Sequence, residues 1–513
     1  MTDRALVARD GRLPAVQYLR ALAAIAVVLF HASVYLEAKR NDAAFLSVFD
    51  GRFGGFGVSL FFVISGYLMA RLSGSPSPSL FLLHRIARIY PIYLIVVAVV
   101  LAGNWWSDGM TPVDWAAYSL VPGPHTYVLG TEWTLPFEIT FYVVVAAAMV
   151  VGMGRQIHRV AIVWLALIFI CLVIAPHWAT YSTGGMFPTL PYLLLSEKCT
   201  AFALGLMIPV MLARRRFGRT ALVAGVLLIA ASAALPAFGN VLMALGCTLL
   251  VGVAATPTAG RSFKALSLLG DWSFALYLVH VPVIVWLMVA LPASWPSAVV
   301  WGIAVIVPVA VSVGAGMLDI GLYRRVKRWC DASTPRQRAL VCGLFLTVFV
   351  VGGMHVDGIE RRDRSTLEAA NELGRRFDAQ PVTGALATRA PPQDLLASTE
   401  LRGYLDTVSA HPKQKGVAVV TGWVLDTSDK DSAPVALFFI NGRYVGAVLP
   451  TTPRKDVIAA LGKGSSSRVS FSRSITRDAC PNSDRLEALI LSGDRFAVMG
   501  LPPQASACPA SAL

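Results

Sequence analysis

The sequence predicts a polytopic all-α membrane domain, with a ten-span core and an eleventh span, followed by a C-terminal extracytoplasmic β-sandwich-like domain. The 513 residues are 56% apolar and only 14% charged, whereas soluble domains are about 45–50% apolar and about 25% charged. Eleven apolar stretches are each long enough to cross a bilayer, which takes about 20 residues. Beyond residue 402, apolar and polar residues alternate between turn signals, as in β-strands.

These stretches define the expected domains: a membrane domain at 1–330, an additional transmembrane helix at 338–357, a linker with a short helix at 358–401, and a β-rich domain at 402–513. The first stretch is longer than the apolar region of a signal peptide and lacks a clean cleavage site, so it is interpreted as an uncleaved span. The expected spans lie near 16–37, 54–71, 88–106, 128–152, 160–177, 190–212, 220–236, 239–256, 266–290, 297–320 and 338–356.

Lys and Arg residues are distributed unevenly between the expected loops. With the N-terminus inside, the inner segments carry 20 of them, and the outer loops between spans carry three, Lys39, Arg40 and Arg52. Because cytoplasmic loops are enriched in Lys and Arg, we expect a bacterial cytoplasmic (inner) membrane protein with its N-terminus in the cytoplasm and its C-terminal domain outside. These clusters account for the net charge of +14. No nucleic-acid partner is expected, since that would need a basic face on a soluble domain.

The first span contains Arg20 near its inner end and His31 deeper in the bilayer, about 16 Å apart along the helix axis. A charge inside a span costs at least about 2.5 kcal/mol and is normally paired or functional. His31 could accept a proton from a hydroxyl group, because imidazole titrates near neutrality. The alternative, favoured for a single buried histidine, is a hydrogen bond between packed helices.

Arg85 and Arg88 lie three residues apart at the start of the third span, on one helix face toward the cytoplasm. Two guanidinium groups placed in this way can bind phosphates in bidentate fashion. Anchoring by positive residues on the inner side of the membrane explains them as well.

The fourth span begins with GTEWTLPFEITFYVV, where Glu132 lies at the outer end and Glu138 about a turn and a half deeper. Glu138 could orient His31 or bind a sugar acceptor, and Trp133 offers an apolar face for a pyranose ring. The alternatives are a structural ion pair of Glu138 with a cation of another span and simple exposure of Glu132 at the interface.

The ninth span, LLGDWSFALYLVHVPVIVW, places Tyr277 and His280 on one helix face. His280 is expected at a depth comparable to that of His31, because both spans run from inside to outside. Glu197 and Lys198 in the sixth span are interpreted as a structural ion pair. The sequence contains no CxxC or HExxH pattern at metal-ligand spacing, so no metal is expected.

Five sequence blocks occur in an order that resembles the acyltransferase-3 family of integral membrane O-acyltransferases, which modify surface polysaccharides, lipopolysaccharide and related glycans. They extend from about Val16 to Tyr323 and read LRALAAIAVVLFHA, FGGFGVSLFFVISGYLMA, FLLHRIARIYPIY, EWTLPFEITFY and LGDWSFALYLVHVPV. WTLPFE replaces the commoner WSLxxE, and FALYLVH carries Phe where Ser-Tyr is frequent, but no charged residue is lost. The GDS block that opens the SGNH hydrolase-like domain of many relatives is absent from the sequence.

The resemblance implies roles for the polar residues that match the family's motifs. Catalysis is expected from His31, Glu138 and Arg20, acyl-CoA binding from Arg85, Arg88 and Arg20, and support of the site or the acceptor from Tyr277 and His280. The position of Glu132 and Trp133 at the outer end of the fourth span, independent of the resemblance, adds these two residues to the expected acceptor or supporting group. His31 would act either as a base toward the acceptor hydroxyl or as a transient acyl carrier.

The expected function is transfer of an acetyl or succinyl group from cytoplasmic acyl-CoA, with acetyl-CoA as the expected donor, to a sugar hydroxyl of a surface polysaccharide, lipopolysaccharide or related glycan. Membrane lipid and a glycan or lipid-linked sugar are the expected partners, and no bound cofactor is expected. The alternative is a transporter or flippase without acyl-transfer activity, since polar residues in spans also mark permeation paths. Transporters often contain inverted repeats, and none is detected in the sequence.

The outer domain is expected to be a small antiparallel β-domain, with NGR as a hairpin turn between two strands. It is interpreted either as a scaffold or as a glycan-contacting module with Trp423 as the platform. Cys480 and Cys508 are the only cysteines expected outside the membrane, where oxidation is permitted, so a disulfide between them is expected.

Overall fold

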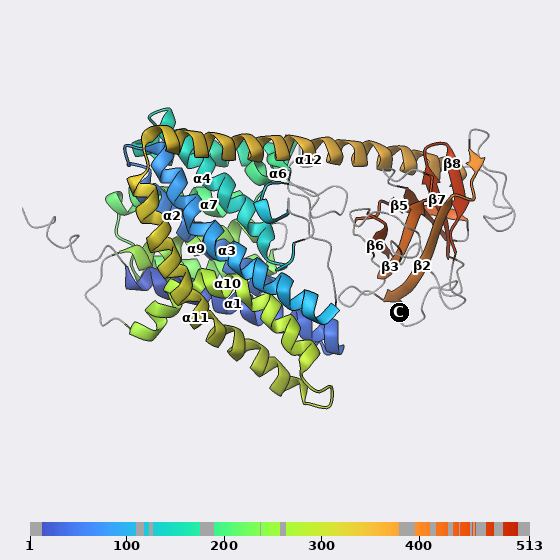
Figure 1. Ribbon diagram of the computed structural model, residues 1–513, viewed down its shortest axis with the longest axis horizontal. Helices are drawn as coiled ribbons and strands as arrows, with labels where there is room; N and C mark the ends of the chain where they lie inside the picture. The colour runs from blue at the N-terminus through green and yellow to red at the C-terminus, as the bar shows by residue number, and fades with distance from the viewer. Residues whose placement is uncertain are drawn as a thin grey trace, which may run out of the picture. The chain divides into compact units, whose positions relative to one another are not determined.

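The computed structural model (Figure 1) consists of two compact units, one extending to Gly353 and the other beginning at Met354. Each unit is considered separately. The described residues are 13–108, 117–122, 127–174, 189–235, 238–256, 263–378, 395–410, 417–428, 434–440, 442–451, 454, 457, 468–476 and 486–500.

The first unit is a bundle of apolar helices. Eight described helical segments are long and apolar enough to cross a membrane, and three shorter apolar helices, α7, α8 and α9, accompany them. This confirms a polytopic helical membrane domain. The helices are α1 (Pro14–Arg40), α2 (Gly51–Leu72), α3 (Pro78–Asp108), α4 (Leu135–Val150), α5 (Ile157–Ile174), α6 (Leu190–Leu195), α7 (Cys199–Arg214), α8 (Arg219–Ala234), α9 (Gly239–Ala255), α10 (Lys264–Ala290), α11 (Ser297–Ala332) and α12 (Pro335–Asp378).

Close packing of α1 and α2 with their neighbours brings the polar residues of several spans together. Helix α1 packs along α10 and α2, and α2 packs along α7. A Cβ atom at Gly270 of α10 would collide with the backbone carbonyl of Gln17, and one at Gly66 of α2 would collide with that of Phe202. Small residues at such crossings let helix backbones approach closely in a membrane. The glycine-rich second span therefore serves helix packing.

The sixth expected span is interrupted in the structure. Helix α6 ends at Leu195, and α7 begins at Cys199, with Ser196 in an extended conformation between them. The side chain of Thr189 accepts a hydrogen bond from the backbone of Tyr192 and so caps the start of α6. The break places Glu197 and Lys198 outside regular helix, within the bundle.

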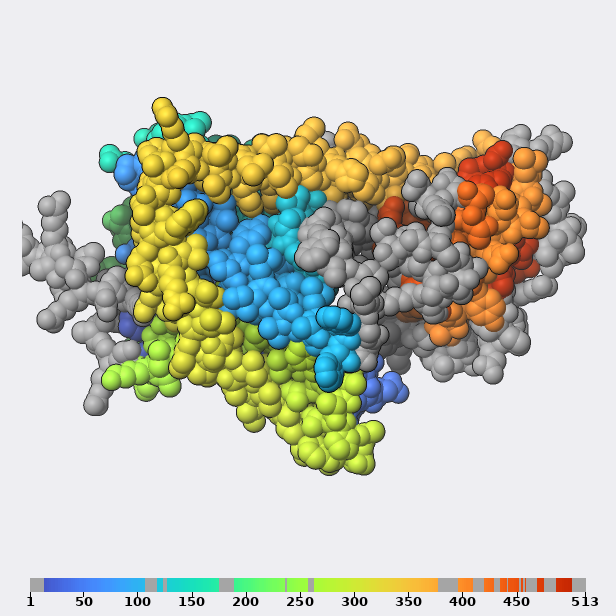
Figure 2. Space-filling model, viewed as in Figure 1, coloured from blue at the N-terminus to red at the C-terminus, as the bar shows by residue number. Residues whose placement is uncertain are grey.

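Helix α11 and the first part of α12 lie at the surface in the view of Figure 2, and many of their apolar side chains are exposed. Only 22% of the most apolar stretch of each helix is buried, as expected for helices that face lipid. The short helix expected within 358–401 is the C-terminal part of α12, which continues without a break from the additional span expected at 338–357.

The second unit contains the end of α12 and two β-sheets. One sheet has the strand order β1-β8-β7-β4-β5 and the other has the order β2-β3-β6. The strands are β1 (Leu396–Ala397), β2 (Leu401–Ala410), β3 (Val417–Asp426), β4 (Val435–Ile440), β5 (Arg443–Val448), β6 (Ser470–Thr476), β7 (Leu486–Ser492) and β8 (Arg495–Val498). A C-terminal β-sheet region is thus confirmed.

Strand β4 explains how the second unit is layered. All six of its residues are buried. Ala436, Phe438 and Ile440 share a hydrophobic core with the three-stranded sheet, whereas alternate residues such as Phe439 pack with Ala370 of α12. Successive side chains of a strand point to opposite faces, so a strand covered by a sheet on one side and a helix on the other is apolar throughout.

Polar contacts reinforce the packing of α12 within the second unit. Asp363 forms two hydrogen bonds, of 2.5 and 3.0 Å, with the guanidinium group of Arg468, and Tyr444 donates a hydrogen bond of 2.6 Å to Asn371.

Trp423 packs against the cluster formed by Leu425, Val457 and Val469.

Candidate active site

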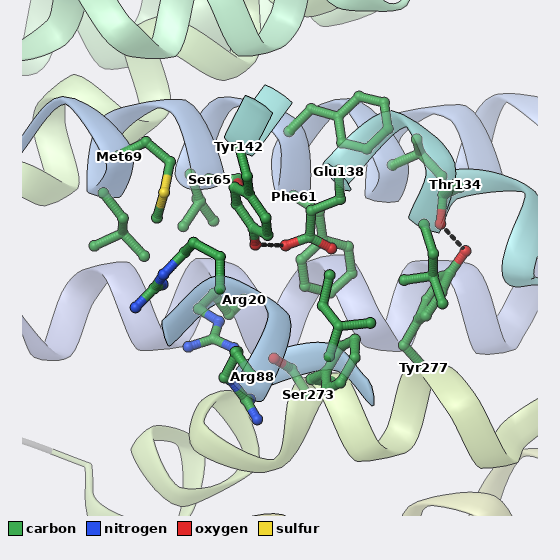
Figure 3. A pocket seen from close by; sticks show the side chains of 18 of the residues that line it. Arg20, Phe61, Ser65, Met69, Arg88, Thr134, Glu138, Tyr142, Ser273 and Tyr277 are labelled. Carbon is green, nitrogen blue, oxygen red and sulfur yellow. Dashed lines mark hydrogen bonds between the residues drawn. The ribbon is translucent and has the colours of Figure 1, made fainter. Parts of the chain in front are cut away.

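A cavity of about 320 Å³ lies among α1, α2, α3, α4, α10 and α11 (Figure 3). We call it the arginine cavity, because Arg20 of α1 and Arg85 and Arg88 of α3 line it. Its other polar lining residues are Ser65, Thr134, Glu138, Tyr142, Ser273, Tyr277 and Tyr323. Basic residues that lie more than 60 positions apart in the sequence thus converge on one space.

The three arginines have different partners. Arg88 Nη1 lies 2.5 and 2.7 Å from the two carboxylate oxygens of Asp319, whose side chain is only 2% exposed. Arg20 Nη1 donates a hydrogen bond of 3.3 Å to the Gln17 side chain. Among the described residues neither Arg20 nor Arg85 forms an ion pair, and Arg85 Nε is buried without a hydrogen-bond partner. Two guanidinium groups without a carboxylate at ion-pair distance suit an anionic ligand such as a phosphate.

Polar groups also face the middle of the arginine cavity. Ser273 lies on one side of it, and Glu138 and Tyr142 lie on the other (Figure 3). Ser273 is fully buried, and its hydroxyl has no hydrogen-bond partner among the described residues. The Tyr142 hydroxyl donates to the Glu138 carboxylate. An unpaired buried hydroxyl costs about 1–3 kcal/mol, so Ser273 marks a position where a ligand can supply a polar partner.

A second cavity of about 220 Å³ contains His31 and is called the histidine cavity. It shares Val58, Phe62 and Tyr277 with the arginine cavity, so the two spaces are adjacent and separated by few side chains. Its polar lining residues are His31, Ser59, Trp133, Glu197, Lys198, Asn240 and Tyr277.

His31 and His280 form a hydrogen-bonded pair whose tautomers follow from their partners. His280 Nδ1 lies 2.8 Å from the Tyr277 carbonyl and 3.1 Å from the Leu276 carbonyl. Carbonyl oxygens only accept hydrogen bonds, so His280 carries its proton on Nδ1 and a lone pair on Nε2. His31 Nδ1 lies 3.0 Å from that Nε2 and 3.0 Å from the Val27 carbonyl, so it donates. The network therefore assigns the lone pair of His31 to Nε2, which can accept a proton from a hydroxyl group.

Glu132 is fully buried rather than exposed at the membrane interface. Its carboxylate accepts hydrogen bonds from the backbone N–H groups of Leu129, at 2.7 Å, and Thr131, at 3.1 Å. The Thr131 carbonyl accepts a hydrogen bond of 2.7 Å from the Tyr277 hydroxyl, which also lies 2.6 Å from Thr134 Oγ1. Glu132 thus holds the turn that fixes Tyr277 at the boundary of the two cavities.

The structure does not bring Glu138 to His31, in contrast to one of the roles expected for it. Helix α4 directs Glu138 into the arginine cavity, and the residue that contacts His31 is His280. The ion pair expected between Glu197 and Lys198 does not form either. Glu197 accepts a hydrogen bond from Asn240, and the ammonium group of Lys198 lies 5.1 Å from the centre of the Trp133 ring. This contact occupies one face of the ring that was expected to hold a sugar.

Asp319 and Ser273 were not predicted as site residues from the sequence. Asp319 could have been found, because an acidic residue inside the tenth expected span needs a partner. Cys480 and Cys508, expected to form a disulfide, lie outside the described residues. Within the part of the chain that is described, no group of three or more His, Cys, Asp and Glu side chains could hold a metal ion.

The first unit is thus a bundle of apolar helices in which a cavity lined by arginines lies beside a hydrogen-bonded histidine pair. The chain belongs to the acyltransferase-3 family, because the acyltransferase domain of that family matches residues 13–317. It is therefore an O-acyltransferase, as the five sequence blocks predict.

Two relatives illustrate the range of the family. The acyltransferase MdmB of Streptomyces mycarofaciens is 26% identical over 315 residues, which are 54% of this chain and 80% of the relative. The exopolysaccharide production protein ExoZ of Rhizobium meliloti (strain 1021) is 33% identical over 135 residues, which are 24% of this chain and 43% of the relative. No solved structure matches the chain.

Proposed function

We propose that this O-acyltransferase moves an acetyl or succinyl group from cytoplasmic acyl-CoA to a sugar hydroxyl of a surface polysaccharide or related glycan. The observation that carries the proposal is the pairing of two adjacent spaces, one lined by three arginines of which two form no ion pair with a described residue, and one containing a histidine with a free basic nitrogen. A transfer enzyme needs both an anchor for its anionic donor and a base for its acceptor.

The arginine cavity is the proposed donor site. Arg85 and Arg20 would bind phosphates of CoA, while Asp319 holds Arg88 in place through an ion pair in which Arg88 Nη1 contacts both carboxylate oxygens. The Ser273 hydroxyl, buried and unpaired, would hydrogen-bond the polar pantetheine arm or the thioester carbonyl. The thioester would then reach His31 past Tyr277, which lines both cavities.

The reaction that this arrangement supports is a single acyl transfer. His31 Nε2 accepts the proton of the sugar hydroxyl while the hydroxyl oxygen attacks the thioester carbon. The carbon–sulfur bond breaks, and the CoA sulfur leaves with the proton that His31 had taken. His280 stabilises the imidazolium form of His31 by accepting the hydrogen bond from its Nδ1–H group.

The membrane orientation of this site follows from the distribution of positive charges. The inner segments carry 20 Lys and Arg residues against three in the outer loops between spans, which favours an inner-membrane protein with a cytoplasmic N-terminus and an extracytoplasmic C-terminal domain. The name of ExoZ, an exopolysaccharide production protein, supports a surface glycan as the acceptor. The β-domain would then lie on the side of the glycan, where contact with it is a further expectation.

The test is acyl transfer by the purified full-length protein in lipid vesicles. Radiolabelled acetyl-CoA or succinyl-CoA is supplied together with surface polysaccharide from a deletion strain, after chemical removal of its O-acyl groups. Alkali-labile label on the polysaccharide supports the proposal. Movement of a lipid-linked glycan across the vesicle membrane without label transfer would instead identify the rival function, a flippase or transporter.

A further inference from the structure

The break between α6 and α7 gives the histidine cavity a polar wall that regular helix would not supply. Glu197 and Lys198 lie in this break, and both line the cavity together with His31. Asn240, near the start of α9, lines the same space. Interrupted helices inside a membrane are found where backbone or side chains line a binding cavity. The break therefore points to a ligand site next to the base.

The two charges of the break have different partners. The Glu197 carboxylate accepts a hydrogen bond from the Asn240 side chain. Lys198 is partly buried, and its ammonium group lies 5.1 Å from the centre of the Trp133 ring. Within the described part of the chain, no carboxylate lies within the ion-pair distance of 4.0 Å from this ammonium group. The cavity thus contains a cation that has an aromatic contact and is not engaged in an ion pair with a described carboxylate, although Glu197 lines the same space.

We propose that Lys198 binds a carboxylate of the acceptor, so that the histidine cavity selects an acidic sugar unit, such as a uronic acid or a sugar bearing an acidic substituent. The inference rests on the proposed function and deepens it by naming the class of acceptor. The Glu197–Asn240 pair accepts and donates hydrogen bonds to sugar hydroxyls, and Trp133 holds the Lys198 side chain in place. His31 then receives the proton of a hydroxyl on the same sugar unit or the next one.

The charges of the two cavities distinguish a carboxylate from a phosphate ligand. The arginine cavity is lined by three guanidinium groups and the Glu138 carboxylate, and neither Arg20 nor Arg85 has a described carboxylate at ion-pair distance, which suits the multiply charged phosphates of CoA. The histidine cavity presents one ammonium group, and the neighbouring Glu197 carboxylate repels a second negative charge. A singly charged, polyhydroxylated ligand fits this balance.

The experiment compares two forms of the acceptor polysaccharide. De-O-acylated polysaccharide from the deletion strain is used either untreated or after chemical reduction of its carboxylates to primary alcohols. The full-length wild-type protein, Lys198→Met and Lys198→Arg are assayed in vesicles for kcat and KM with labelled acyl-CoA. Lys39→Met is the matched control, because Lys39 is an exposed lysine of α1 that lines neither cavity.

The proposal predicts that the wild-type protein acylates the untreated polysaccharide with a kcat/KM at least about tenfold higher than that for the reduced one, since a hydrogen bond to a charged group is worth about 1.5–3 kcal/mol. Lys198→Met should lose this preference through a higher acceptor KM, with the KM for acyl-CoA unchanged. Lys198→Arg and Lys39→Met should retain the preference.

Three outcomes would overturn the proposal, and they separate its failure from the failure of the proposed function. Equal transfer to both polysaccharides by the wild-type protein, or a preference that persists in Lys198→Met, refutes the acidic acceptor and leaves the acyl-transfer function standing. Absence of transfer to either polysaccharide refutes both. If Lys198→Met transfers label to the reduced polysaccharide at the wild-type rate, the variant is folded, and its loss of preference is not caused by misfolding.

Discussion

Replacement of His280 by leucine tests whether the two histidines work as a pair. The substitution removes the nitrogen that accepts the hydrogen bond from His31 Nδ1 at 3.0 Å, while the Val27 carbonyl, also at 3.0 Å, remains. The neutral His31 ring loses one hydrogen bond, worth about 0.5–1.5 kcal/mol. In the transition state His31 is charged, and the same hydrogen bond is worth about 1.5–3 kcal/mol. The difference, about 1–1.5 kcal/mol, corresponds to a kcat about 5- to 13-fold lower.

The assay is steady-state acyl transfer in vesicles with acyl-CoA and de-O-acylated polysaccharide. The KM for acyl-CoA should not change, because His280 does not line the arginine cavity. His280→Gln, whose amide oxygen can accept the hydrogen bond, should recover part of the rate. His158→Leu on α5 is the control, since His158 lines neither cavity. An unchanged kcat in His280→Leu, or an effect confined to the KM for acyl-CoA, would refute the role of the pair.

Two further predictions concern the arginine cavity. Arg85→Ala should raise the KM for acyl-CoA about tenfold to 100-fold with little change in kcat. The reason is that a charge-assisted contact worth about 1.5–3 kcal/mol is lost in both the ground state and the transition state. An unchanged KM would exclude Arg85 from donor binding. Asp319→Asn should lower the thermal unfolding temperature in detergent, because Arg88 then lacks its counter-ion. The loss of stability should be smaller than the roughly 3–5 kcal/mol of a fully buried ion pair, since Arg88 is 22% exposed. A variant as stable as the wild-type protein would show that the ion pair does not stabilise the fold.

The helical architecture was largely predictable, because lipid makes the length and apolarity of each span visible in the sequence. The expected spans correspond to helices except at Ser196–Lys198, where one span is divided into α6 and α7. Hydropathy reports the average polarity of a window and cannot show where backbone leaves the helix. Helix α12 presents the opposite case, since its charged C-terminal part suggested a separate helix although the backbone continues to Asp378.

The clustering of the site residues was predictable only in part. Equal depth was expected for His31 and His280 from the direction of their spans, and the structure joins them by a hydrogen bond. Which face of α4 meets which neighbour depends on tertiary packing, so the direction of Glu138 could not be read from spacing alone. The burial of Glu132 was missed for a related reason, since its partners are backbone N–H groups of the preceding turn, which leave no sequence signal.

The central claim is that His31 is the base for acyl transfer, and the single-turnover rate of a His31→Ala variant tests it most directly. The variant is loaded with labelled acyl-CoA in vesicles, and ester formation on de-O-acylated polysaccharide is followed by rapid quench. We expect a rate lower by about 10²–10⁴-fold, with acyl-CoA binding retained because His31 does not line the arginine cavity. Ester formation at the wild-type rate would contradict it.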